Sequence, residues 1–543
     1  MLKLIHKPFA IISPKLGPSP DELKIIFSFL LSYPLAGLLK RIPDSKPGRK
    51  NLFSISISVF YLVGLFDLWD GLFTIFISSA GAYAIAKYFR GSPYMPWLGF
   101  AFVMGHMSVS HIQRQVANNP ASVDVTGAQM VLLMKLSAFC WNVADGRLPE
   151  DQLTDFQKER MLRELPSILD FAGYVLFFPS LMVGPAFDYA DYRQWIDTTM
   201  FNVSETMDPA KKPPVRKKRK IPRSGTPATF KALTGLVWIG LFVFFGGRFS
   251  TEHLTSDSYM EYNFIHRVFI LYMTSLTARF KYYGVWSLTE GSCILAGLGY
   301  NGVDPVTGKV SWNRLQNIDP WMVETAQNPR AFLGGWNMNT NHWLRNYVYL
   351  RVTPRGKKPG FRASLMTFGT SALWHGFYPG YYLSFVLASF IQTAAKHFRR
   401  HIRPFFLDPI SGQPSAKKRY YDIATFFGTQ ATFAFATAPF LILHFRQCLL
   451  VWFRVFFYAL VWTVASLAFF ASPGKAVLKS QLEKRLGRTR AKLERTISTD
   501  SLTGKEPILG ISKDPEGDIN EAIEELKAEI ELKEKQRKEK KTK

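Results

Sequence analysis

The stretch "FKALTGLVWIGLFVFFGG", from Phe230 to Gly247, decides the fold class of this chain. Its only charged residue is Lys231, which lies next to its beginning. An α-helix that crosses the hydrocarbon core of a bilayer needs about 20 mainly apolar residues. The stretch therefore predicts a transmembrane helix.

Further apolar runs of similar length lie on both sides of this stretch. Cys448–Ala471 carries one charge, Arg454, and Leu52–Phe89 is long enough for two helices that break at "DLWDG", Asp67–Gly71. The other candidate spans are Ile25–Leu39, Pro96–Val109, Gln129–Trp141, Ile168–Val183, Val268–Ala278, Leu365–Ile391 and Ile423–His444. We therefore expect an all-α, polytopic membrane protein with about eleven spanning helices. No internal repeat is visible, which argues against an inverted-repeat transporter.

The composition agrees with a membrane protein. Of 543 residues, 47% are hydrophobic, and the net charge of +26 comes from basic residues in the loops and the tail. Positive charge in such places sets membrane orientation and attracts anionic headgroups, so we do not expect nucleic acid as a partner. The three cysteines, Cys140, Cys293 and Cys448, adjoin apolar sequence and argue against a disulfide framework, a zinc ribbon or a redox pair.

We divide the chain into three parts. Residues 1–20 form an N-terminal segment that is interrupted by proline and lacks the apolar run of a cleavable signal peptide. Residues 21–472 form the membrane domain, which includes a basic loop at 208–225 that we expect in the cytosol and a long connector at Asn301–Trp321. Residues 473–543 form a charged tail, also expected in the cytosol.

The chain ends with "KKTK", in which Lys540 and Lys541 stand fourth and third from the C-terminus. This ending resembles the dilysine signal that returns membrane proteins to the endoplasmic reticulum. It predicts a multi-pass protein of that membrane with a cytosolic C-terminus. The sequon at Asn202 adjoins the basic loop and is expected to be unglycosylated.

Two stretches place polar side chains where burial makes them costly. "GGWNMNTNHWLRNYVYLR" (Gly334–Arg351) is rich in asparagine, and "SALWHGFYPGYYLSF" (Ser371–Phe385) contains His375 in an apolar run. A buried asparagine without partners costs roughly 1–3 kcal/mol, and an ionisable residue at membrane depth is by default a functional candidate. A neutral histidine bonded between helices is the structural alternative.

The spacing of the asparagines predicts a polar face on a helix. Asn337, Asn341 and Arg345 are four residues apart and share one side of a helix. Another side carries the aromatic residues Trp336, Trp343 and Tyr347. The polar side is expected to line a cavity, and the alternative is a hydrogen-bonded seam between helices.

Together, the two stretches resemble the membrane-bound O-acyltransferase family, in particular its lysophospholipid acyltransferase branch and the fungal enzymes of broad specificity. Three more stretches agree with this resemblance: Gln129–Gly146, Phe177–Tyr192 and Ala278–Gly302. The resemblance implies a helical fold in which an asparagine and a histidine face each other in a tunnel. It also implies that acyl-CoA enters this tunnel from the cytosol and a lysophospholipid from the bilayer or the lumen.

The resemblance implies that the chain is an acyl-CoA-dependent acyltransferase that esterifies the sn-2 hydroxyl of lysophosphatidic acid, lysophosphatidylcholine, lysophosphatidylethanolamine and related lipids. The family's histidine falls on His375 and its asparagine on Asn337, with Asn341 as an open competitor. Acyl-CoA is then a co-substrate, and the chemistry requires no metal or redox cofactor. Nothing in the sequence indicates an oligomeric state.

These residue types suit the chemistry. A neutral imidazole takes a hydroxyl proton as the ester bond forms, and an amide N–H stabilises a developing oxyanion. We expect further substrate contacts from Trp336, Asn341, Arg345, Trp374 and Glu290. Glu290 is expected to orient His375, to line the tunnel or to form a structural ion pair. His106, His111 and His342 are interpreted as structural or interfacial.

Two other functions compete with this interpretation. The first is an O-acyltransferase for a sterol, a diacylglycerol or a protein, against which the residues around the asparagines argue. The second is a polytopic transporter or lipid scramblase whose asparagine and histidine line a permeation path. A scramblase would move lipid without forming an ester.

Overall fold

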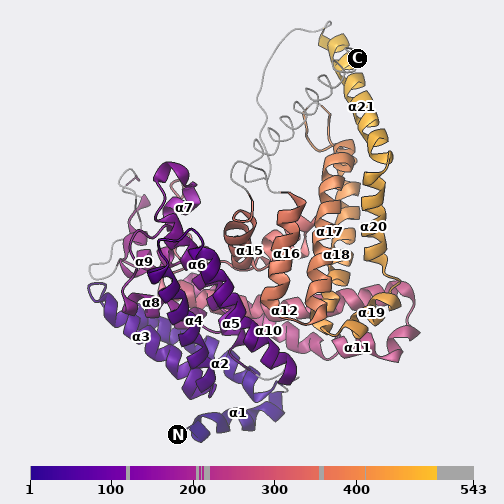
Figure 1. Ribbon diagram of the computed structural model, residues 1–543. Helices are drawn as coiled ribbons and strands as arrows, with labels where there is room; N and C mark the ends of the chain where they lie inside the picture. The colour runs from indigo at the N-terminus through magenta and orange to yellow at the C-terminus, as the bar shows by residue number, and fades with distance from the viewer. Residues whose placement is uncertain are drawn as a thin grey trace. The chain divides into compact units, whose positions relative to one another are not determined.

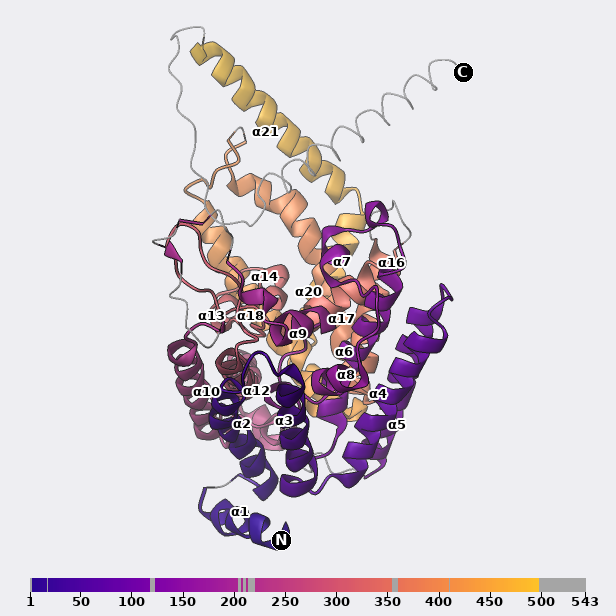
Figure 2. The same cartoon turned by 90° about the vertical axis from the view of Figure 1, so that its left-hand side faces the viewer.

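In a computed structural model, residues 2–16, 18–117, 123–203, 207–208, 211–212, 220–353, 360–409 and 411–497 are described. They form helices joined by loops, and among them we find two isolated β-bridges but no strand (Figures 1 and 2). The all-α fold class is therefore confirmed for these residues. The chain divides into two compact units, Met1–Leu482 and Glu483–Lys543.

Residues 2–246 contribute ten α-helices to the described structure. They are α1 (Leu2–Leu16), α2 (Pro20–Leu39), α3 (Pro47–Val59), α4 (Trp69–Tyr88), α5 (Met95–Ala117), α6 (Thr126–Asp145), α7 (Asp155–Arg160), α8 (Ile168–Val175), α9 (Tyr189–Ile196) and α10 (Gly225–Gly246). A π-helix, η1 (Phe60–Leu65), ends just before α4, so a break between two helices is confirmed, but it covers Phe66–Leu68 and the last three residues of the predicted break at Asp67–Gly71 belong to α4.

The described residues after Gly246 contain the longest helix of the described structure, α12. Its α-helices are α11 (Thr251–Thr255), α12 (Phe264–Ala296), α13 (Pro320–Glu324), α14 (Pro329–Gly335), α15 (Met338–Leu344), α16 (Phe361–His375), α17 (Pro379–His397), α18 (Lys418–Ile442), α19 (Phe445–Arg454), α20 (Tyr458–Ala471) and α21 (Gly474–Ile497). Two more π-helices are η7 (Arg345–Tyr349) and η8 (Phe398–Ile402).

Two helical segments in the described part of the chain are long and apolar enough to cross a membrane, α2 and the segment Gly225–Thr255 that begins with α10. A third is added if α19 and α20, bent by 81°, count as one span. Several long internal helices carry buried polar groups that lower their hydropathy. Examples are Lys135 and Asp145 in α6 and Glu290 in α12.

Three predicted spans are interrupted. Ile168–Val183 is helical only to Val175 before a short 3-10 turn, and Cys448–Ala471 bends between α19 and α20. Leu365–Ile391 breaks after His375, because Gly376 takes φ 125° and ψ −164° and Pro379 starts the next helix. The region φ > 0 favours glycine, and proline favours an extended residue before it. His375 therefore ends a helix.

The compact unit Met1–Leu482 is held together by long helices in close contact. In Figure 1, α17, α18 and α20 run side by side, and α19 lies across their lower ends. Helix α12 packs against α2, α10 and α18. A Cβ on Gly235 of α10 would lie 2.8 Å from Cγ of Leu288, so this glycine lets α10 and α12 approach closely.

Candidate active site

His375 is the last residue of α16, and its ring lies among aromatic side chains. Its Nδ1 is 2.7 Å from the carbonyl oxygen of Ser371. A carbonyl oxygen only accepts hydrogen bonds, so Nδ1 carries the proton and Nε2 has a free lone pair. The rings around it belong to Trp374, Tyr381, Phe385 and Phe440, with centroids 4.6 to 5.7 Å away.

The neighbouring residue Trp374 is held from two helices. Its indole N–H donates to the carbonyl of Met130 in α6, 3.0 Å away. Its own carbonyl oxygen lies 3.1 Å from Nε2 of His111 in α5. The sequence predicts a structural or interfacial role for His111, and its contact with the residue before His375 is a finding of the structure.

Asn337 does not lie on the polar face of a continuous helix, as its spacing predicted. It occupies the N-cap of α15 with φ 43° and ψ 55°, and its side chain makes no capping bond. Instead, its Oδ1 accepts a hydrogen bond of 2.9 Å from the Thr340 hydroxyl. This bond uses the oxygen of the amide, so the two N–H groups on Nδ2 remain able to donate to a substrate.

The backbone after Asn337 is anchored by Asn317, which lies in the segment predicted as a connector. The carbonyl of Asn317 accepts from the Met338 N–H at 2.8 Å, and its side-chain Oδ1 accepts from the Asn339 N–H at 3.0 Å. Asn317 itself is buried, and its backbone N–H lies beside the Glu290 carboxylate. No sequence signal pointed to Asn317, because it lies in a loop and its partner Asn339 in α15 is 22 residues away.

Helix α6 supports both candidate catalytic residues. Met130 binds the indole of Trp374, and the sulfur of Met134 lies 3.4 Å from the Thr340 hydroxyl that binds Asn337. Four residues along an α-helix correspond to one turn, or about 6 Å. The structure therefore brings the supports of His375 and Asn337 onto adjacent turns of one buried helix.

Residues 116–438 match the model of the membrane-bound O-acyltransferase (MBOAT) family. The chain belongs to this family. A lysophospholipid acyltransferase of Schizosaccharomyces pombe is 43% identical over 93% of this chain and 98% of its own length. One of Saccharomyces cerevisiae is 42% identical over 89% of this chain and 80% of its own. Lysophospholipid acyltransferase 2 of Arabidopsis thaliana is 30% identical over 84% of this chain and 94% of its own.

The competitor amide of this MBOAT protein, Asn341, is already engaged. Its Nδ2 donates to the carbonyls of Leu333 and Trp336, at 2.5 and 2.8 Å. Both hydrogens of the amide are thereby used in closing the end of α14. Asn341 thus holds the turn that leads into Asn337.

The other predicted site residues lie in different surroundings. The Trp336 ring packs against Tyr282 and Trp286 of α12, with centroids 5.5 and 5.1 Å apart. Glu290 is buried and pairs with Lys231 at 2.9 Å, so the ion-pair alternative is the one that the structure shows. Arg345 is exposed at the start of η7.

Arg351, six residues after Arg345, takes part in a buried polar network. Its guanidinium binds both oxygens of Asp145, at 2.8 and 2.5 Å, and stacks over the Trp141 ring. Nearby, the Tyr347 hydroxyl donates to Asn142 at 3.0 Å. These contacts attach η7 to α6, and they give Arg351 a structural role.

We predict that Arg351→Ala lowers the thermal stability of the MBOAT protein. Removal of one partner from a buried ion pair costs about 3–5 kcal/mol, because the remaining charge is left uncompensated. Arg345→Ala, at an exposed position, is the matched variant and is expected to keep the wild-type melting midpoint. Thermal denaturation of the detergent-solubilised variants measures this difference, and equal midpoints would contradict the assignment.

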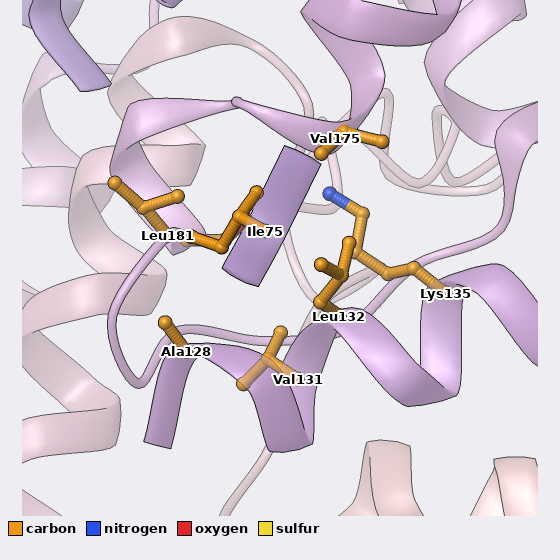
Figure 3. Close-up of a pocket in the computed structure, with 8 residues that line it drawn as sticks. Ile75, Ala128, Val131, Leu132, Lys135, Val175 and Leu181 are labelled. Carbon is orange, nitrogen blue, oxygen red and sulfur yellow. The ribbon is translucent and has the colours of Figure 1, made fainter. Parts of the chain in front are cut away.

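One small cavity adjoins α6 (Figure 3). It has a volume of about 10 Å³, room for a single water molecule, and Lys135 is among its lining residues. The Lys135 ammonium donates to the Tyr174 carbonyl at 2.5 Å and lies over the rings of Tyr174 and Phe187. Neither this cavity nor a surface groove along α19 is lined by His375 or Asn337. The tunnel that the resemblance implies therefore stays a prediction.

The described residues contain no group of three or more His, Cys, Asp or Glu side chains placed to hold a metal ion. The three cysteines are buried and free.

Proposed function

We propose that this MBOAT protein transfers a fatty acyl chain from acyl-CoA to the free sn-2 hydroxyl of lysophospholipids. The expected acceptors are lysophosphatidic acid, lysophosphatidylcholine, lysophosphatidylethanolamine and related lipids. Family membership and the names of the relatives support this proposal. The observation that carries it concerns a histidine with a free Nε2 lone pair and an asparagine with a free amide donor: the residues that support them, Trp374 and Thr340, both contact helix α6.

In the proposed mechanism, His375 is the general base. Its Nδ1–H is held by the Ser371 carbonyl, so Nε2 is the atom that takes the proton of the glycerol hydroxyl. The hydroxyl oxygen then attacks the thioester carbonyl, the C–S bond breaks, and the proton passes from the imidazolium to the leaving CoA sulfur. The aromatic rings around His375 exclude water, which protects the thioester from hydrolysis.

Asn337 is the proposed oxyanion donor. Its Nδ2 would donate to the thioester oxygen as negative charge develops there. The engagement of both hydrogens of Asn341 supports the choice of Asn337 over Asn341. Asn341 and Glu290 then act indirectly, because both hold segments that border Asn337.

Three further residues complete the proposed site. Trp336 and Trp374 form aromatic walls beside Asn337 and His375. Arg345 is proposed to contact the phosphates of CoA, because its guanidinium is exposed at the helix that follows Asn337. Acyl-CoA is a co-substrate in this proposal, and no step uses a metal or redox cofactor.

We propose a topology of about eleven spans. Internal helices such as α6 and α12 can be counted among them, because most of their charged side chains are buried in the protein and do not face lipid. The catalytic domain covers residues 21–472, and the basic loop 208–225 and the tail 473–543 lie in the cytosol. We place the protein in the endoplasmic reticulum membrane on the basis of Lys540 and Lys541. These two lysines and half of the basic loop, residues 209–210 and 213–219, lie outside the described residues.

The test is an acceptor panel with one labelled acyl-CoA and the purified protein in nanodiscs. We expect labelled diacyl phospholipid from each lysophospholipid and no labelled ester from a sterol or a diacylglycerol. An ester formed only from a sterol or diacylglycerol would favour the first rival function. Movement of fluorescent lipid between leaflets without any ester would favour the scramblase.

A further inference from the structure

His111 is buried in α5 and touches the backbone on both sides of His375. It is 5% exposed, and its Nε2 lies 3.1 Å from the carbonyl oxygen of Trp374. That carbonyl belongs to the peptide bond that joins Trp374 to His375. Since a carbonyl oxygen only accepts, Nε2 of His111 carries the hydrogen of this bond.

The same ring packs against Gly376. A Cβ at this glycine would lie 3.1 Å from Nδ1 of His111, which is closer than an ordinary contact between carbon and nitrogen. Gly376 also has a positive φ of 125°, which favours glycine, and a side chain there would force the His111 ring to shift. His111 therefore limits how the chain can leave α16 after His375.

The end of α16 needs such an external contact. The last four carbonyls of an α-helix have no partner within the helix, and that of Trp374 is one of them. The Gly376 N–H donates to the carbonyls of Ala372 and Leu373, at 3.2 and 3.1 Å, so it does not bind the carbonyl of Trp374. His111 supplies a donor to the carbonyl next to His375.

The position of His111 is itself fixed by the packing of α5 on α6. One turn further along α5, Arg114 pairs with Asp124 at 2.9 Å, and Asp124 accepts from the Thr126 N–H at the start of α6. Helix α6 binds the indole of Trp374 through Met130. Trp374 is thus fixed by a side-chain bond to α6 and a backbone bond to α5, two helices that are attached to each other.

We propose that His111 is a positioning residue for acyl transfer, which holds the Trp374–His375–Gly376 backbone so that Nε2 of His375 faces the acceptor hydroxyl. This inference rests on the proposed role of His375. A misplacement of a reacting group by about 1 Å costs about 100-fold in rate. Loss of the His111 bond should therefore lower kcat and leave substrate binding unchanged.

The test compares His111→Phe with His111→Gln. Phenylalanine keeps an aromatic ring of similar size and removes the donor, so kcat is expected to fall by about 10- to 100-fold with both KM values unchanged. The glutamine amide offers an N–H to the Trp374 carbonyl and is expected to restore most of the activity. His106→Phe is the matched control, since His106 lies on the same helix, bonds to Ser78 at 2.8 Å and should tolerate the change.

Each outcome decides the inference. A wild-type kcat in His111→Phe, or an equal loss in His111→Phe and His111→Gln, overturns it. If His111→Phe does not fold, His111→Asn replaces it, because its shorter amide falls short of the Trp374 carbonyl. An inactive His375→Ala beside an active His111→Phe removes this inference alone, whereas an active His375→Ala removes the proposed role of His375 itself.

Discussion

Replacement of His375 by alanine is expected to lower kcat by about 10²- to 10⁴-fold, the range that general base catalysis contributes. The glycerol hydroxyl is barely acidic at neutral pH, and Nε2 of His375 is the proposed acceptor of its proton. Alanine removes the ring without adding a charge or bulk. The rate of labelled diacyl phospholipid formation in nanodiscs measures the effect at saturating acyl-CoA.

Two controls separate chemistry from folding in this experiment. The His375→Ala protein should elute as a single species and bind acyl-CoA with the wild-type Kd, because binding does not require the base. His106→Ala removes a histidine of α5 that is bonded to Ser78 of α4, and it should keep the wild-type rate. Full activity of His375→Ala would remove the general-base assignment.

The sequence was informative about where helices lie because hydrophobic length is a local property. The apolar run at Ile25–Leu39 falls within α2, and the run at Phe230–Gly247 ends one residue beyond α10. The break between η1 and α4 covers Phe66–Leu68 and overlaps the predicted break at Asp67–Gly71. Val268–Ala278 covers only part of α12, which continues to Ala296. The rest of α12 contains Glu290 and other polar residues that are buried against neighbouring helices, and a hydropathy window scores these residues as exposed to lipid.

The conformation around Asn337 was not predictable from residue spacing. A period of 3.6 residues assumes a continuous α-helix, but here Asn337 adopts φ 43°, α15 is only seven residues long, and a π-helix starts at Arg345. Asparagine enters the left-handed region more readily than most residues. The sequence therefore identified the polar segment that contains Asn337. It did not show that the positive φ of Asn337 takes this residue off the helix face predicted for Asn341 and Arg345.

The supporting residues of the site were missed for a different reason. His111 and Trp374 are 263 residues apart, and Asn317 and Asn339 are 22 apart across a break in helical structure. Neither pair belongs to one periodic pattern, so no motif joins the partners. Only the packing of α5 and α6 against the end of α16, and of the connector against α15, brings them together.

Replacement of Asn337 by alanine is expected to have the second largest effect, a fall in kcat of about 10²- to 10³-fold, as for the loss of one oxyanion donor. The amide is the proposed donor to the thioester oxygen, and its contribution grows as charge develops, so KM should change little. Asn337→Asp is informative as well. A carboxylate keeps the acceptor for Thr340 but offers no N–H, and it should be as inactive as alanine.

Asn341→Ala is the matched variant, four residues along the same segment. Its amide binds the carbonyls of Leu333 and Trp336, so its loss should loosen the turn before Asn337 and lower the melting midpoint. We expect a smaller fall in kcat than in Asn337→Ala, because the donor itself is retained. A larger loss in Asn341→Ala than in Asn337→Ala, in proteins of equal thermal stability, would reverse the assignment and make Asn341 the oxyanion donor.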